Sequence, residues 1–159
     1  MGSVSGTLAL PELGFSQTTV NLSSSLPMDE LKFGMVEHRV PLLRSDIYLS
    51  LQASHSRGRP GHRLKDNEIE TLSRYLAGEV TWKVIRQRSH NLDLSVSLDW
   101  RNSRTDILGE ILTRDYIRSL TLAGRYEFQD DWNGANIVEL SCSRGLGIMG
   151  ASSEGDINL

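Results

Sequence analysis

The chain has 159 residues, a hydrophobic content of 38% and a net charge of −3. Its charges are mixed, so it lacks the basic stripe of a nucleic-acid-binding protein, and we expect no nucleic-acid partner. No apolar run approaches the roughly 18 residues that a membrane helix requires. A transmembrane β-strand needs only about 9–11 residues, with every second one apolar, so this composition remains compatible with a membrane β-barrel.

Cysteine and histidine usage argues against a metal site. The single cysteine, Cys142, excludes an internal disulfide and any multi-cysteine site. The four histidines lie far apart without ligand-like spacing, at His38, His55, His62 and His90. We therefore expect neither a metal nor a cofactor. Residues 1–6 lack the charged and apolar regions of a signal peptide, so we expect that it was removed or that the chain is an internal piece of a longer protein.

The first part of the chain shows a weak alternation of apolar and polar residues. It is short at 4–10 and longer at 15–26 and 31–41. In the last stretch Glu37 falls on the side that otherwise carries Leu31, Phe33 and Met35. A β-bulge there would restore the register.

From residue 47 onward the alternation is strong. The clearest stretch is 92–100, where one side is wholly apolar and the other wholly polar. Its even positions are Leu92, Leu94, Val96, Leu98 and Trp100, and its odd ones are Asp93, Ser95, Ser97 and Asp99. The same pattern recurs over four further stretches, 47–54, 75–84, 116–129 and 135–144. The chain is therefore predicted to be all-β, an antiparallel up-and-down meander of about eight strands without a helix.

The connections between these strands are predicted to differ in length. Short turns are expected at 11–14, 42–45, 87–90 and 130–134. Longer polar links are expected at 58–69, at 106–115 and from 145 onward, while the link near 27–29 is an exception. Short turns at one end and long loops at the other are typical of outer-membrane barrels.

The alternation also predicts two faces. We expect a lipid-facing set that comprises Trp82, Leu94, Val96, Leu98, Trp100, Leu122, Tyr126 and Phe128. We expect a lumen-lining set that comprises Lys83, Asp93, Asp99, Arg118, Arg125, Glu127 and Glu139. The large aromatic residues would form two interfacial girdles.

Two turns fix the expected register. The turn at 87–90 should place Trp82 opposite Leu94 and Val80 opposite Val96. The turn at 130–134 should bring Arg125 close to Glu139.

Alternating strands also build soluble sandwiches and small barrels, in which the apolar face packs inward. Strands in such folds average about 5–6 residues. Several stretches here exceed ten residues and carry a polar face rich in Ser, Thr, Arg, Asp and Glu. This pattern favours the membrane barrel over a soluble carrier of a small apolar ligand.

No motif in the chain indicates an enzyme. The glycines at 145, 147 and 150 spell G-x-G-x-x-G after a strand, but a dinucleotide site also needs a helix at that point, and the following residues are typical of a loop. No serine, histidine and acid stand in a nucleophile motif. Asp130 and Asp131 precede Trp132, Asn133 and Gly134 in what reads as a turn.

Four stretches resemble a known family. They are Arg101–Gly109 (RNSRTDILG), Arg114–Leu120 (RDYIRSL), Phe128–Asn136 (FQDDWNGAN) and Ser143–Ala151 (SRGLGIMGA). In their order and spacing they are similar to segments of the two-partner-secretion transporters, the ShlB/FhaC/HecB haemolysin secretion and activation proteins. The stretch 15–57 fits the family more loosely.

The resemblance implies a sixteen-stranded pore in the bacterial outer membrane that exports one large haemolysin or adhesin partner. Periplasmic POTRA domains and a long loop with a VRG[YF]-type motif belong to that family, and residues 1–159 contain neither. We therefore expect about half of a transmembrane β-barrel domain, with outer-membrane lipid and a secreted protein as partners. The alternatives are another outer-membrane barrel, such as an assembly factor or a porin, or the soluble carrier.

An open sheet cannot be stable in lipid, because each unpaired backbone group there costs several kcal/mol. We therefore expect that closure needs further strands or oligomerisation.

Overall fold

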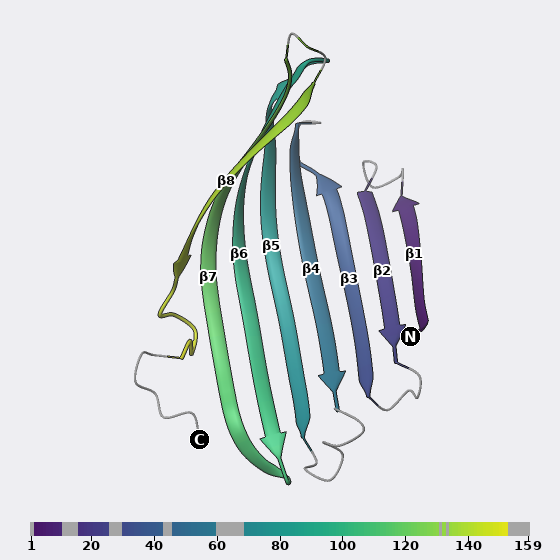
Figure 1. The fold of residues 1–159 in the computed structure, drawn as a ribbon, viewed down its shortest axis with the longest axis vertical. Helices are drawn as coiled ribbons and strands as arrows, with labels where there is room; N and C mark the ends of the chain where they lie inside the picture. Colours follow the sequence, from purple (N-terminus) through teal and green to yellow (C-terminus); the bar gives the residue numbers. More distant parts are fainter. Residues whose placement is uncertain are drawn as a thin grey trace.

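The computed structural model describes residues 2–10, 16–25, 30–42, 46–59, 69–130, 132 and 134–152. These residues form one eight-stranded antiparallel sheet in which neighbours in sequence are neighbours in space (Figure 1). This confirms the predicted all-β meander. The described residues include no helix that is long and apolar enough to cross a membrane.

The strands lengthen from nine residues in the first two to 20 in the seventh, and the eighth has 11. Their bounds are β1 (Gly2–Leu10), β2 (Ser16–Ser24), β3 (Leu31–Pro41), β4 (Ile47–Gly58), β5 (Glu70–Arg86), β6 (His90–Ile107), β7 (Glu110–Gln129) and β8 (Ala135–Gly145). We call the end at which β6 meets β7 the Leu108 end of the sheet, and the end at which β7 meets β8 the Trp132 end.

The predicted register between β5 and β6 is confirmed. Trp82 pairs with Leu94, and Val80 pairs with Val96. The turn between these strands closes with a hydrogen bond from the backbone N–H of Gln87 to the carbonyl of His90, at 2.9 Å.

The long loop predicted at 106–115 is absent. β6 continues to Ile107 and β7 begins at Glu110, so the connection is a tight turn of Leu108 and Gly109, with φ values of 53° and 79°. Positive φ at both central residues suits the twist of a two-residue hairpin. The prediction ended the strands too early because the alternation stops near Trp100, where polar residues occupy both faces although backbone pairing continues.

The bulge expected near Glu37 is also absent, since β3 pairs without interruption with both β2 and β4. Instead Leu31, Phe33 and Met35 lie on the same polar face as Glu37, which pairs with Gln52. The prediction assigned the wrong face to these apolar residues. Bulges do occur elsewhere, between Lys83 and Ile85 and between Thr105 and Asp106.

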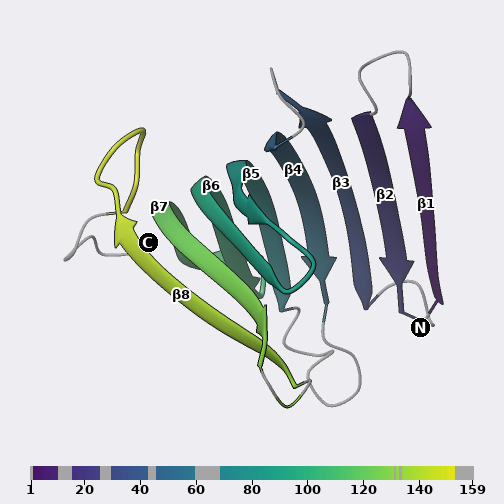
Figure 2. The ribbon, with the colours of Figure 1, turned by 90° about the horizontal axis from the view of Figure 1, so that it is seen from above.

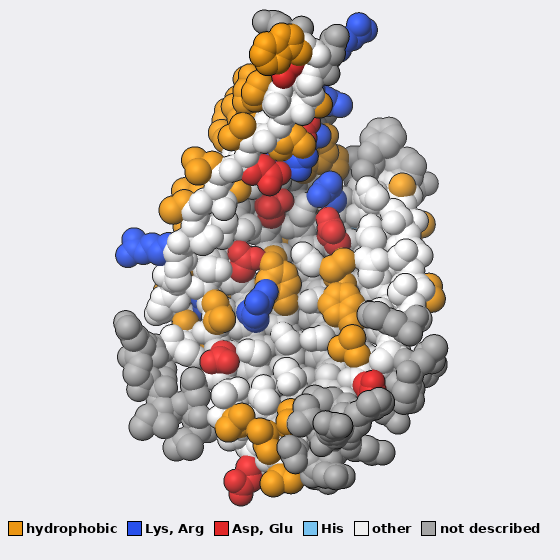
Figure 3. All heavy atoms as spheres, in the orientation of Figure 1, with side chains coloured by type: hydrophobic (Ala, Val, Ile, Leu, Met, Phe, Trp, Pro, Cys, Tyr) orange, Lys and Arg blue, Asp and Glu red, His pale blue; other side chains and the backbone are white. Residues whose placement is uncertain are grey.

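The sheet forms an open arc (Figure 2). Figure 3 shows its concave face, on which charged side chains of both signs gather, and the register places most of the apolar positions of β4 to β8 on the convex face. Among the described residues Ala77 is the one buried hydrophobic residue. Large apolar side chains on the convex face are exposed instead, for example Leu76 at 53% and Leu122 at 54%. The described chain therefore has no closed apolar core.

β1 and β8 each pair with one neighbour, so the sheet is not closed on itself. Beyond β8 the chain stays against β7. The N–H of Leu146 donates to the carbonyl of Arg118, and that of Ser152 donates to the carbonyl of Tyr116. The residues between them form a loop with positive φ at Met149 and Gly150. The glycine motif thus lies in a loop, as predicted, and no helix follows it through residue 152.

The β5–β6 register can be tested with paired cysteines in a Cys142→Ser background. Val80→Cys with Val96→Cys should form a disulfide under mild oxidation, because directly opposed residues have Cα atoms about 5 Å apart. Val80→Cys with Ser97→Cys is the matched control, because its two thiols point to opposite faces. Crosslinking in the control but not in the test pair would show that the register is off by one residue.

Candidate functional site: the two faces of the sheet

Charged residues form a row across the concave face. The register aligns one residue from each of β5, β6, β7 and β8, namely Lys83, Asp93, Arg125 and Glu139. Their signs alternate along the row. Opposite charges in adjacent positions let the face remain charged and hydrated without strong repulsion.

Arg125 forms two ion pairs, one with Glu139 in this row and one with Glu127 on its own strand. Its guanidinium lies 2.6 Å from a carboxylate oxygen of Glu127 and 3.2 Å from one of Glu139. The second contact confirms the pairing predicted across the 130–134 turn. The Arg125 side chain is 48% exposed and that of Glu139 is 63% exposed, so water screens the attraction and the pair contributes little to stability.

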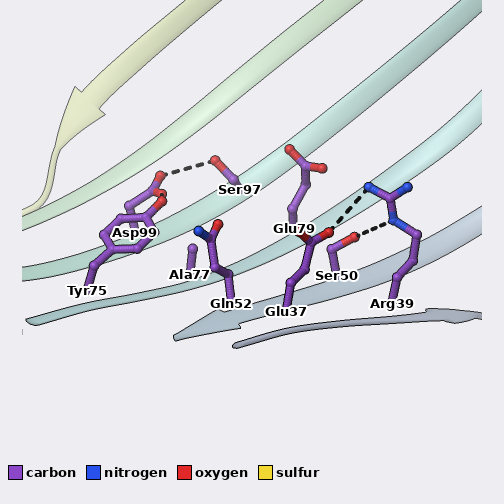
Figure 4. A pocket seen from close by; sticks show the side chains of 9 residues that line it. All are labelled: Glu37, Arg39, Ser50, Gln52, Tyr75, Ala77, Glu79, Ser97 and Asp99. Carbon is purple, nitrogen blue, oxygen red and sulfur yellow. Dashed lines mark hydrogen bonds and ion pairs between the residues drawn. The ribbon is translucent and has the colours of Figure 1, made fainter. Parts of the chain in front are cut away.

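A shallow polar pocket of about 170 Å³ lies nearer the middle of the concave face (Figure 4). Its lining comes from β3, β4, β5 and β6 and consists of Glu37, Arg39, Ser50, Gln52, Tyr75, Ala77, Glu79, Ser97 and Asp99. Its volume is equivalent to about six water molecules at liquid density. The pocket is therefore a depression in a hydrated wall and too small for a large ligand.

Hydrogen bonds fix the side chains of this pocket. Asp99 accepts a 2.5 Å hydrogen bond from the Tyr75 hydroxyl and a 3.1 Å bond from the Ser97 hydroxyl. Arg39 donates from Nε to the Ser50 hydroxyl at 3.1 Å. These bonds occupy much of the polar capacity of the groups. They leave a mixed-charge surface suited to transient hydrogen bonding.

One predicted lumen residue, Arg118, lies on the other face. It pairs with Trp100, and its guanidinium lies 5.0 Å from the centre of that ring. It is only 6% exposed, and Nη1 donates to the carbonyls of Arg101 and Ile117. The prediction was wrong because it followed residue type. Arg118 is an even position of its strand, like Leu120 and Leu122, so the alternation itself would have assigned it to the apolar face.

The remaining predicted residues are on the faces that were expected. The register places all eight apolar residues named for the lipid side on the convex face, and Lys83, Asp93, Asp99, Arg125, Glu127 and Glu139 on the concave face. Sequence reasoning missed His90, which stacks on Tyr126 with ring centroids 6.1 Å apart and shares a 2.9 Å hydrogen bond with its hydroxyl. The position of His90 opposite Phe128 is the feature that could have identified this aromatic contact.

Two further features of the described residues concern metal ligands and the single thiol. No group of three or more His, Cys, Asp or Glu residues within the described ranges could hold a metal ion. The free thiol of Cys142 is exposed on β8, where it pairs with Leu122 on the convex face. The site is thus best described as two contrasting surfaces.

Comparisons of the chain with protein-family models, with curated proteins and with solved structures found no match.

Asp130 stabilises the turn at the Trp132 end. It accepts hydrogen bonds from the backbone N–H groups of Trp132 and Gly134, at 3.0 and 2.7 Å, and from the Asn136 amide at 3.1 Å. The Asn136 bond, followed by the backbone bonds, lowers the pKa of the Asp130 carboxyl. Asp131 and Asn133 lie outside the described residues.

This lowered pKa predicts a pH dependence. The carboxylate stabilises the turn at pH values above the pKa of an unfolded aspartate, and the contribution is lost as the pH falls through the lower folded-state pKa. The difference in urea midpoint between the unchanged chain and Asp130→Asn should therefore shrink on acidification. An equal difference at neutral and acidic pH would contradict this role.

A double-mutant cycle tests the Arg125–Glu139 pair. Arg125→Gln, Glu139→Gln and the double variant should give a coupling free energy of only about 0–1 kcal/mol, because both side chains are half-exposed. Urea unfolding in detergent micelles is the measurement. A coupling well above this range would mean that the pair is shielded from water.

Proposed function

We propose that this chain forms part of the wall of a bacterial outer-membrane pore that exports a large partner protein. The observation that carries the proposal is the contrast between the two faces. Exposed apolar side chains cover the convex face, and hydrogen-bonded polar groups cover the concave one. Lipid requires apolar groups on the outer side of a barrel wall, whereas a passage for a polypeptide must be wet.

The open arc supports a large barrel over a small one. An eight-stranded barrel has an interior that side chains can fill, but the concave face is lined largely by small residues. Paired concave positions on β6, β7 and β8 include Ser95, Ser97, Thr121, Ala123, Ser141 and Ser143. Such residues leave space, so the wall suits a wider barrel closed by additional strands at β1 and β8.

The soluble carrier is less well supported. A carrier of an apolar ligand would turn its apolar side chains inward, around a closed cavity. Here they lie on the convex side of the arc, and the pocket on the concave side is polar. Within the membrane class, the four stretches similar to two-partner-secretion transporters favour an export pore over a passive porin or an assembly factor.

The chain alone should not form a discrete pore, because two unpaired strand edges cannot face lipid. Reconstitution of residues 1–159 in planar bilayers should give no reproducible single-channel conductance and no heat-modifiable folded band on gels. Discrete conductance together with such a band would show that these strands close by themselves, and the proposed half-barrel would be wrong.

Export can be tested by crosslinking in bacteria that make the chain with its native neighbouring genes. A benzophenone probe on Ser97→Cys, in a Cys142→Ser background, should crosslink to an exported polypeptide, because Ser97 lines the concave face. The probe on Val96→Cys is the matched control and should not do so, because Val96 is on the convex face. Equal crosslinking at both sites would contradict the export role.

A further inference from the structure

Basic residues gather on the convex face toward the Leu108 end of the sheet. The register places on this face Lys32, Arg57, Arg74, Arg104, Arg114, Arg118 and Arg144. We call these seven residues the basic belt. Two acidic residues, Glu70 and Asp106, lie opposite each other among them. At the Trp132 end, by contrast, the paired convex positions of the described strands carry no Lys or Arg, so the convex face has a charged end and an uncharged end.

Most of the belt is not neutralised by the described residues. Arg57 pairs with Glu70, and Arg104 pairs with Asp106. The other five belt residues form no ion pair with any described carboxylate. Arg118 in addition has a buried Nε atom without a hydrogen-bond partner.

The belt also contains like charges in direct opposition. Lys32 lies opposite Arg57, and Arg104 lies opposite Arg114. Like charges directly across an antiparallel pair destabilise a sheet. In each of these pairs one arginine already has a carboxylate partner, so the second cation, Lys32 or Arg114, is left available to an anion outside the sheet.

The position of the belt identifies the kind of anion. Arg118 lies against Trp100 and is 6.0 Å from the ring of Tyr116, and aromatic residues of this type lie at the membrane–water interface. Arg104 is four residues beyond Trp100 on the same strand, which corresponds to about 13 Å. Lys32, Arg57, Arg74, Arg104 and Arg114 therefore extend outward from the end of the apolar band, at the depth of lipid headgroups, whereas Arg144 lies opposite Leu120, one convex row inside the band.

We propose that the basic belt binds the phosphate groups of anionic lipid headgroups in the membrane leaflet at the Leu108 end. Guanidinium groups suit this ligand because they bind phosphate oxygens through two parallel hydrogen bonds. The inference rests on the proposed membrane location. It adds that one leaflet is recognised by charge, which fixes the direction in which the sheet crosses the membrane.

The test uses Trp100 as a fluorescent reporter, with Trp82→Phe and Trp132→Phe removing the other two tryptophans. The chain is assembled with the strands that complete its barrel, from which any tryptophan is removed, in vesicles that contain brominated phosphatidylglycerol or brominated phosphatidylcholine in equal proportion. Quenching at Trp100 measures how often each lipid contacts the belt. We expect phosphatidylglycerol to be favoured by at least about fivefold, the effect of roughly one basic residue at an anionic surface.

Two charge-matched variants isolate the belt. Arg74→Gln with Arg114→Gln and Arg144→Gln should reduce the preference severalfold, because it removes three of the five belt residues that have no ion pair. Arg39→Gln with Lys83→Gln and Arg101→Gln removes the same charge from the concave face and should leave the preference intact. Equal loss in both variants would overturn the proposal, since only net charge would then matter.

The remaining outcomes separate this inference from the proposed function. Quenching by both lipids without preference would overturn the lipid site and leave the membrane wall standing. No quenching by either lipid would contradict the membrane wall itself, and the belt with it. If excess inorganic phosphate abolished the preference, the belt would be a site for soluble anions, which would also overturn the lipid assignment.

Discussion

The strict alternation of side chains along paired strands is the constraint on which this structure depends. Because neighbouring strands pair without slipping over most of their length, apolar positions on one strand lie beside apolar positions on the next. One face thereby becomes continuously apolar and the other continuously polar. A shift of one residue in any strand would place charges such as Asp93 among the leucines, so the register is what produces both the lipid-compatible surface and the hydrated wall.

The two faces differ in how they tolerate charge. On the concave face charges alternate in sign and are exposed, so each pair adds little stability but keeps the surface wet. On the convex face most charges lie toward the Leu108 end, where basic residues are direct neighbours. Arg118 lies at the border between the apolar band and these basic residues, where its contact with the Trp100 ring buries it.

The sequence predicted the all-β meander, the register at two hairpins and most face assignments, because period-two patterning is a local signal. The prediction from sequence failed where the period-two alternation stops. Beyond Trp100 both faces are polar, so the alternation no longer marks a strand, yet backbone pairing continues to the turn at Leu108 and Gly109. In β3 apolar residues occur on the polar face, and only the pairing with β4 reveals their side. The basic belt could not be predicted because it combines residues from six strands whose mutual register was unknown.

The central claim is that one face of the sheet meets lipid and the other meets water, and an accessibility scan along β6 tests it most directly. Single cysteines from 92 to 100, in a Cys142→Ser background, are made in bacteria together with the native neighbouring genes, and the isolated membranes are treated with a water-soluble maleimide. The account predicts rapid labelling at odd positions and protection at even ones, with a period of two. Uniform labelling, or protection of the odd positions, would contradict it.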